Sequence, residues 1–196
     1  FRDEHGRVVY VGKARNLPLY EILGGLTRPR LPAYASLLRY TTPADVGAAC
    51  EGRAAAGFRA IKLHQIDVPT TRAAREAVGP DVAIMLDTNC PWTVDEAIAM
   101  ARRLQPLDLA WLEEPVWPPE DFAGLARVRR EGGIPIAAGE NAQGVMDFRA
   151  AFDAGALDVA QPSVAKIGGV SAMMAIAGLA EARGVRLIPH CAYFGP

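Results

Sequence analysis

The feature that most constrains the fold of this chain is a regular recurrence of polar residues, each placed at the end of a short apolar run. In chain order they are Lys62, Asp87, Glu113, Glu140, Ser163 and His190. Successive members are separated by 25, 26, 27, 23 and 27 residues. Each interval has room for one strand, one helix and two loops. Repeated units of this kind indicate an α/β fold with a parallel sheet, either closed into a barrel or doubly wound.

The apolar runs and the segments between them predict alternating strands and helices. The predicted strands are Ala33–Ser36, Ala60–His64, Val82–Asp87, Leu109–Glu113, Ile134–Ala138, Asp158–Ala160 and Val185–Pro189. The predicted helices are Ala44–Ala56, Thr70–Val78, Thr93–Leu104, Pro118–Glu131, Gly144–Ala154 and Gly168–Arg183. Thr93–Leu104 has the strongest pattern, because Thr93 and Glu96 match a capping box and apolar residues follow at helical spacing.

A barrel explains the polar residues better than a doubly wound sheet does. In a barrel the carboxyl ends of all strands converge on one mouth, so residues far apart in sequence meet there. A doubly wound sheet would spread the same residues along a line, and no glycine-rich phosphate loop opens its first helix. The sequence therefore predicts a parallel barrel.

Three consecutive predicted strands carry carboxylates at their ends. They are Asp87 in "IMLDTN", Glu113 in "AWLEEP" and Glu140 in "IAAGEN". Such a trio would repel itself unless a cation lay among its members, and hard oxygen ligands favour Mg²⁺. Glu113 and Glu114 fall on opposite faces, so only one should bind. The alternative is that each acid merely caps the helix that follows it.

Composition argues against several classes of partner. The formal net charge of −1 gives no electrostatic reason to bind nucleic acid or an anionic membrane. No apolar run approaches the roughly 18 residues that span a bilayer. Cys50, Cys90 and Cys191 are far apart and form no CxxC pair, and the first residues are too polar for a signal peptide. We therefore expect a reduced, cytoplasmic setting.

Several motifs follow one another in a specific order and spacing. They are "LPLYEILGG" (17–25), "GFRAIKLH" (57–64), "LDTN" (86–89), "WLEEP" (111–115), "AAGEN" (137–141), "QPSVAKIGG" (161–169) and "LIPH" (187–190). Together they resemble the enolase superfamily, specifically the branch of mandelate racemase and muconate lactonising enzyme. The resemblance implies a modified (β/α)8 barrel of the TIM type with an α+β capping domain that closes over the substrate. It also implies a homo-oligomer.

The same resemblance implies a chemistry. It makes Asp87, Glu113 and Glu140 the Mg²⁺ ligands, with Asn89 and Asn141 supporting them or the substrate. The family abstracts the proton α to a carboxylate of a small molecule, while Mg²⁺ and a nearby lysine stabilise the enediolate. A dehydratase of acid sugars is the leading expectation. A racemase or epimerase, or a metal-binding member without turnover, are the alternatives.

The second strand of the family usually ends in Lys-x-Lys, whereas this chain has Lys62-Leu63-His64. By resemblance Lys62 helps to hold the substrate carboxylate, and His64 takes the position of the base. Because Mg²⁺ and Lys62 are both positive, we expect a lowered pKa at His64 that favours its neutral form. Trp111 is interpreted as a packing residue.

A second departure lies on the sixth strand. Ser163 stands where the family has an aspartate that pairs with the histidine of the seventh strand, or a second lysine. His190 therefore lacks its usual carboxylate partner, although a serine could still donate or accept a hydrogen bond. This weakens the expectation of a racemase with two bases. One-base chemistry, or His190 as a general acid that assists the loss of hydroxide, is left open. Lys166 is expected to support the site.

The first residues do not fit the barrel pattern. The segment "FRDEHGRVVYVG" (1–12) predicts a hairpin with a turn at His5-Gly6, and it resembles a hairpin of the capping domain. Residues 13–196 are predicted to form a partial barrel domain that carries the metal site. Since only seven strands are visible, we expect the barrel to be truncated, with most of the cap and the C-terminal end outside these 196 residues.

Overall fold

The computed structural model describes residues 19–25 and 29–191, apart from the side chain of Ile22. The chain divides into two units, Phe1–Ala33 and Tyr34–Pro196. The described part of the first unit contains one short helix, α1 (Leu19–Ile22). The hairpin predicted within residues 1–12 lies outside the described residues.

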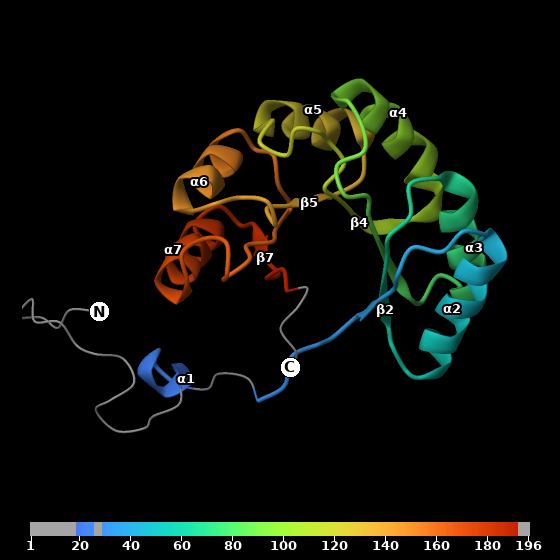
Figure 1. The fold of residues 1–196 in the computed structure, drawn as a ribbon, viewed down its shortest axis with the longest axis horizontal. Coiled ribbons are helices and arrows are strands. Elements are labelled where there is room, and N and C mark those ends of the chain that lie inside the picture. The colour runs from blue at the N-terminus through green and yellow to red at the C-terminus, as the bar shows by residue number, and fades with distance from the viewer. Residues whose placement is uncertain (1–18, 26–28, 192–196) are drawn as a thin grey trace, which may run out of the picture. The chain divides into compact units, whose positions relative to one another are not determined.

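The second unit is built on a curved, all-parallel sheet (Figure 1). Its strands are β1 (Ala35–Ser36), β2 (Ala60–Leu63), β3 (Ala83–Asp87), β4 (Leu109–Glu113), β5 (Ile136–Ala138), β6 (Val159–Ala160) and β7 (Arg186–Leu187). Each strand pairs with the next one along the chain, in the order β1 to β7. A doubly wound sheet would reverse this order near its centre. The predicted repeat and its barrel interpretation are therefore confirmed.

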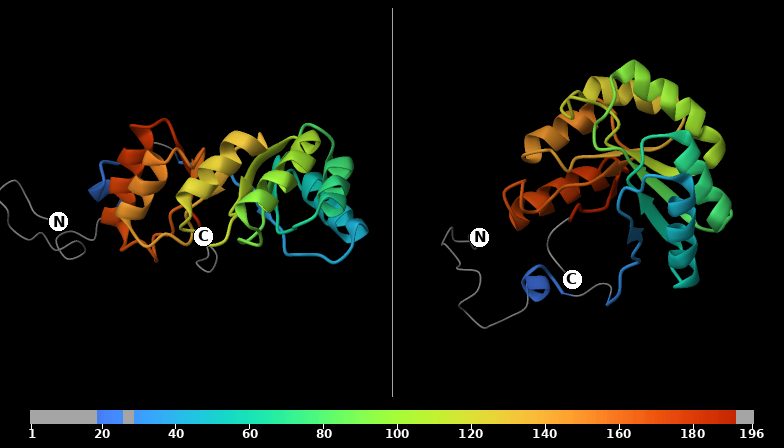
Figure 2. Two further views of the ribbon diagram at one scale, coloured as in Figure 1. Left: turned by 90° about the horizontal axis from the view of Figure 1, so that it is seen from above. Right: turned by 45° about the vertical axis from the view of Figure 1, so that its right-hand side comes forward.

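A helix follows each of the first six strands and covers the convex side of the sheet (Figures 1 and 2). These helices are α2 (Pro43–Ala55), α3 (Val68–Val78), α4 (Val94–Leu104), α5 (Phe122–Gly132), α6 (Val145–Asp153) and α7 (Val170–Glu181), with a 3₁₀ turn at Gln105–Leu107 after α4. The helix expected from Pro118 begins instead at Phe122. Asp121 caps it by accepting a hydrogen bond from Gly124 N, and Pro118 remains in the preceding loop.

Local side-chain caps fix where several helices begin. At α4 the capping box is present: Thr93 accepts from Glu96 N, and Glu96 accepts from Thr93 N at 2.9 Å. At α2 the side chain of Thr42 accepts from Asp45 N, and at α3 the side chain of Asp67 accepts from Thr70 N. Since each cap follows a strand by a few residues, the loops at the carboxyl end of the sheet are held short. We call this end of the sheet the mouth.

The two faces of the sheet bury different clusters. Residues that point outward, such as Ile84, Leu86 and Leu112, pack against the helices. A smaller inner cluster contains Met85 and Trp111, which are partners in the β3–β4 register. Because side chains alternate along a strand, the residue two positions beyond each of these also faces inward. This register places polar groups at the mouth, directly above the inner apolar cluster.

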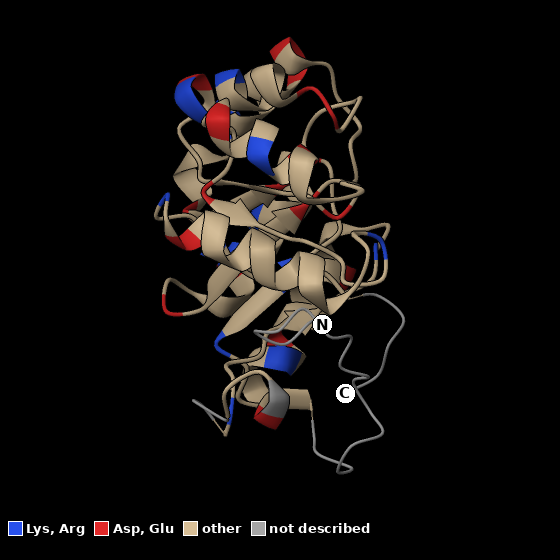
Figure 3. Cartoon of the chain, turned by 90° about the vertical axis from the view of Figure 1, so that its left-hand side faces the viewer, with Lys and Arg blue, Asp and Glu red and all other residues tan. Residues whose placement is uncertain are grey.

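Charges on the helices are interspersed by sign, as Figure 3 shows for one view of the chain. Arg127 of α5, for example, lies 3.1 Å from Asp95 of α4 and 3.2 Å from Glu131. Among the described residues, no helix combines the length and the apolar character that a bilayer crossing requires.

Candidate active site

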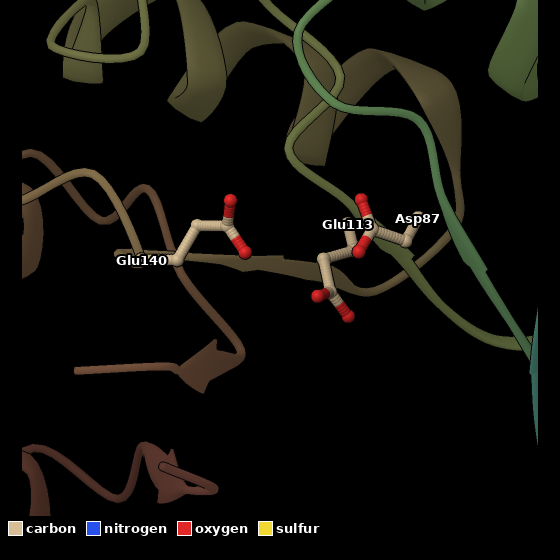
Figure 4. Close-up of side chains that lie close together, drawn as sticks. All are labelled: Asp87, Glu113 and Glu140. Atoms are coloured by element: carbon tan, nitrogen blue, oxygen red, sulfur yellow. The ribbon is translucent and has the colours of Figure 1, made fainter. Parts of the chain in front are cut away.

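Three carboxylates meet at the mouth (Figure 4). Asp87 and Glu113 are the last residues of β3 and β4 and are partners in register, and Glu140 follows β5. One oxygen from each lies within 4.8 Å of the others. Asp87 and Glu113 are buried, with 1% and 0% of their surface exposed, whereas Glu140 is half-buried. An all-oxygen donor set on rigid strand ends fits a hard divalent cation such as Mg²⁺.

Lys62 is the buried positive charge beside this cluster. Its Nζ lies 2.6 Å from Glu113 Oε1 and 2.9 Å from Asp87 Oδ2. Burial by itself lowers the pKa of Lys62, but the charges of Glu113 and Asp87 outweigh it and raise that pKa. For Asp87 the directions are reversed: burial raises its pKa, but the hydrogen bond from His64 and the charge of Lys62 outweigh burial and lower that pKa overall. Lys62 therefore stays protonated and Asp87 stays ionised.

The imidazole of His64 is held at both nitrogens. Nδ1 contacts the carbonyl oxygen of Leu37, and Nε2 lies 3.2 Å from Asp87 Oδ2. Since a carbonyl oxygen can only accept, Nδ1 carries a proton, and Nε2 is the nitrogen that gains or loses one. The hydrogen bond to Asp87 raises the pKa of His64 despite partial burial. The expectation of a lowered pKa considered Mg²⁺ and Lys62 but not this carboxylate, which acts in the opposite direction. The pKa of His64 beside bound Mg²⁺ stays a prediction.

Glu113 has further partners that the sequence analysis missed. Trp111 Nε1 donates to Glu113 Oε2 at 2.8 Å, and Gln161 also forms a side-chain hydrogen bond with Glu113. Trp111 does pack, making an edge contact with Tyr34 at 6.3 Å between ring centroids. Its polar role could have been found from the spacing, because Trp111 and Glu113 are two residues apart on one strand and share a face.

The asparagines next to the carboxylates differ in their contacts. Asn89 donates to Asp87 Oδ1 from Nδ2 at 2.9 Å and from its backbone N at 3.2 Å. It therefore orients Asp87, as a support for a metal ligand would. Asn141 directly follows Glu140, and within the part of the chain that the structure describes no hydrogen bond joins their side chains.

Glu114 faces away from the trio, as the alternation of side chains predicts. Its Oε1 accepts from Gly139 N at 2.9 Å, and its Oε2 lies 3.4 Å from the sulfur of Cys90. Burial raises the pKa of Glu114 to about 7.

His190 lies beside Glu140, with Nε2 3.1 Å from Glu140 Oε2. Its Nδ1 is buried and has no hydrogen-bond partner among the described residues, so the buried Ser163 does not orient the ring. Burial lowers the pKa of His190; the charges of Lys62 and Lys166 lower it further, and Glu140 opposes them. The structure thus brings His190 and Glu140 together but leaves the histidine without the partner that the family provides. Lys166 is exposed, and its positive charge acts on His190.

Comparisons with known proteins agree with this geometry. The family model described as "Enolase C-terminal domain-like" matches residues 45–196. A 3,6-anhydro-alpha-L-galactonate cycloisomerase of Streptomyces coelicolor is 41% identical over 180 residues, which cover 88% of this chain and 49% of the relative. A D-galactonate dehydratase of Ralstonia nicotianae is 35% identical over 194 residues, covering 92% of this chain and 50% of the relative.

A solved structure is similar to most of this chain. It is a racemase from Streptomyces coelicolor A3(2) with bound magnesium, with a TM-score of 0.82 and 40% sequence identity. The match covers 90% of this chain and 51% of that one. The chain therefore spans about half the length of the relatives that it matches.

Proposed function

This chain belongs to the enolase superfamily, in the branch of mandelate racemase and muconate lactonising enzyme, and from that premise we propose that it abstracts the proton α to a carboxylate with the help of Mg²⁺. The proposed substrate is an acid sugar, and the proposed overall reaction is loss of water. The observation that carries the proposal is the meeting of Asp87, Glu113 and Glu140 within 4.8 Å, beside Lys62 and His64.

In this proposal Asp87, Glu113 and Glu140 would hold Mg²⁺, with Asn89, Trp111 and Gln161 fixing their orientation. Bound Mg²⁺ would supply positive charge where the substrate carboxylate gains negative charge during proton removal. Lys62, buried and protonated, supplies a second positive charge at the same place. A C–H bond next to a carboxylate is only weakly acidic, so stabilising this charge is the main task of the site.

His64 is the proposed base. Leu37 holds the proton of the ring at Nδ1, so Nε2 accepts the α-proton. The electron pair of the C–H bond first moves toward the substrate carboxylate, which gives an enediolate, and then forms the C=C bond as the β C–O bond breaks. His190, which follows β7, acts in its imidazolium form, which the neighbouring carboxylate of Glu140 favours. It gives the proton on Nε2 to the departing hydroxyl, and water leaves. The enol product becomes a 2-keto acid, so atoms and charge balance.

A second candidate is an isomerase, and the 41% identity with a cycloisomerase favours it. The first step would be the same, but the carbanion would be reprotonated or attacked within the molecule instead of losing water. A racemase with two opposed bases is less well supported, because His190 has no carboxylate at Nδ1 within the described residues. A family member that binds metal without turnover remains the alternative outside enzymes.

Large exposed apolar residues at the mouth support a capping domain in the whole protein. Leu38, Trp117 and Met146 are 80%, 68% and 69% exposed, and each lies in a loop after a strand or in the first turn of the next helix. Exposed apolar groups collected at one end of a domain are typical of a surface that another element covers. We propose that a cap covers them and supplies substrate contacts. The homo-oligomer and the cytoplasmic setting stay predictions.

The test is a screen of the Mg²⁺-loaded full-length protein, with the proposed cap, against acid sugars, with semicarbazide to detect 2-keto acids. A dehydratase gives a keto acid that requires Mg²⁺ and disappears in EDTA. An isomerase instead incorporates deuterium from D₂O at the α-carbon and yields an isomer without keto acid. If the protein binds Mg²⁺ but forms neither a keto acid nor an isomer, the proposal of catalysis is overturned. Turnover that survives EDTA would overturn the role of the metal.

A further inference from the structure

Glu114 is the buried glutamate that the proposed reaction does not use. Only 1% of its surface is exposed. Its backbone φ is +45°, a value that residues other than glycine rarely adopt. A carboxylate buried in this way is costly unless its oxygens have partners. Both oxygens do have partners, and these lie on two other loops of the mouth.

One of these partners fixes the loop that carries Glu140. Glu114 Oε1 accepts from Gly139 N at 2.9 Å, and Gly139 immediately precedes Glu140. Gly139 has φ +123°, and a Cβ at this position would approach Phe148 Cε1 to 2.6 Å. The backbone before Glu140 is therefore in a form that only glycine adopts easily, and the carboxylate of Glu114 holds its N–H.

The other partner fixes the loop that carries Asp87. Glu114 Oε2 lies 3.4 Å from Cys90 Sγ, and the carbonyl oxygen of Glu114 accepts from Cys90 N at 2.6 Å. Thr88 Oγ1 donates to the same carbonyl oxygen at 2.9 Å. Asn89, which lies between Thr88 and Cys90 in the chain, donates from Nδ2 to Asp87 Oδ1.

The Asp87 loop is also strained. Asn89 and Cys90 have φ of +56° and +55°, so two successive residues other than glycine are left-handed. Such residues persist only where surrounding contacts hold them. The contacts of Cys90 with Glu114 help to do so here. Hydrogen bonds from Asn89 to Asp87 and from Thr88 to the backbone at the end of β4 hold the same loop.

We propose that Glu114 is a positioning residue that sets the spacing of Asp87 and Glu140 around Glu113, and so determines the affinity of the site for a divalent cation. It acts through Gly139 on one side and through Cys90 on the other. The inference rests on the proposed metal site, since it concerns the same three carboxylates.

The probe is Mn²⁺, and free Mn²⁺ is measured by electron paramagnetic resonance after removal of metals with EDTA. In the variant Glu114→Met, a side chain of similar size fills the space but cannot accept from Gly139. We expect its Mn²⁺ dissociation constant to rise at least about tenfold, as for other supports of metal ligands. Glu114→Gln keeps an acceptor oxygen and should restore the affinity to within about threefold of the parent.

A matched control separates positioning from loss of stability. Leu104 is fully buried in the last turn of α4, at the end of the domain opposite the mouth. Leu104→Ala should lower the melting temperature while leaving the Mn²⁺ affinity unchanged. If Glu114→Met fails to fold, Glu114→Asp replaces it, because the shortened side chain keeps its charge but draws back from Gly139.

Each outcome has a defined meaning. Binding by Glu114→Met, or by its Asp substitute, that equals the parent overturns the inference. So does an equal loss of affinity in Leu104→Ala, because stability alone would then explain the effect. If the parent chain does not bind Mn²⁺ at all, the proposed metal site itself fails, which is a different result from the failure of Glu114 to position it.

Discussion

The ammonium of Lys62 lies 2.6 Å from Glu113 Oε1, and both groups are buried at the carboxyl end of the same sheet. The two residues are 51 positions apart in sequence and come from strands β2 and β4. Asp87, on the strand between them, shares the same ammonium. One buried cation thus offsets two buried anions, and this balance is the basis of the first prediction.

Replacing Lys62 with Met should destabilise the protein in EDTA. The variant leaves the two carboxylates without their ammonium, and breaking a buried ion pair costs about 3–5 kcal/mol. We expect the free energy of unfolding, measured with urea, to fall by about 3 kcal/mol, and Mg²⁺ to recover part of the loss. Lys166→Met, at an exposed lysine of the mouth, is the control and should not change stability. A Lys62→Met variant as stable as the parent in EDTA would contradict the role given to this pair.

Mg²⁺ should raise the melting temperature, and Glu140→Gln should remove this effect. A ligand that binds only the folded state adds about 2.7 kcal/mol at one hundred times its dissociation constant. Glu140 is the half-buried member of the trio, so its replacement should disturb the fold least. Calorimetry measures the shift. Trp111 fluorescence should report binding independently, because its indole N–H bonds Glu113. An equal Mg²⁺ shift in Glu140→Gln would mean that the cation binds elsewhere.

The variant His64→Asn tests the base. Loss of a general base costs about 10²- to 10⁴-fold in rate, so exchange of the substrate α-proton with D₂O should fall by that factor. Mg²⁺ binding should persist, since the trio is unchanged. Proton NMR of the substrate follows the exchange. If exchange survives, the base lies elsewhere, and His190→Asn is the next variant to examine.

Asp158 gives a prediction about pH that does not involve the proposed metal site. Burial raises its pKa, but hydrogen bonds from Arg129 and from Ile136 N outweigh this and lower it below 3.8. The folded state therefore holds this proton less tightly than the unfolded state. The resulting stability is present above the unfolded pKa and is lost as the pH falls through the folded pKa.

For Asp158→Asn we therefore expect a loss of about 1 kcal/mol at neutral pH, kept small because Arg129 is partly exposed to water. The difference from the parent should shrink as the pH falls below the unfolded pKa of about 3.9. Urea unfolding over this range measures it. Asp95→Asn is the matched control for the change of charge, because Asp95 is 85% exposed in its pair with Arg127 and its replacement should leave the stability at neutral pH close to that of the parent. If the difference in unfolding free energy between Asp158→Asn and the parent does not change with pH, the lowered pKa given to Asp158 is wrong.

The sequence by itself determined the parts of this protein that depend on local rules. Alternation along a strand separates Glu113 from Glu114, and the structure indeed turns only the first toward Asp87 and Glu140. The capping box of Thr93 sets the start of α4 because both partners lie within one turn. The repeat of about 25 residues gave the parallel order of the strands, since short connections favour neighbours in sequence as neighbours in space.

The tertiary structure decided what depends on contacts between distant strands. The direction of the pKa shift at His64 is set by Asp87, and its tautomer by the carbonyl oxygen of Leu37. Whether Ser163 orients His190 was equally open in the sequence, and the buried Nδ1 without a partner answers it for the described residues. These outcomes depend on tenths of an ångström between side chains that the curvature and register of the sheet bring together, and no local pattern encodes such distances.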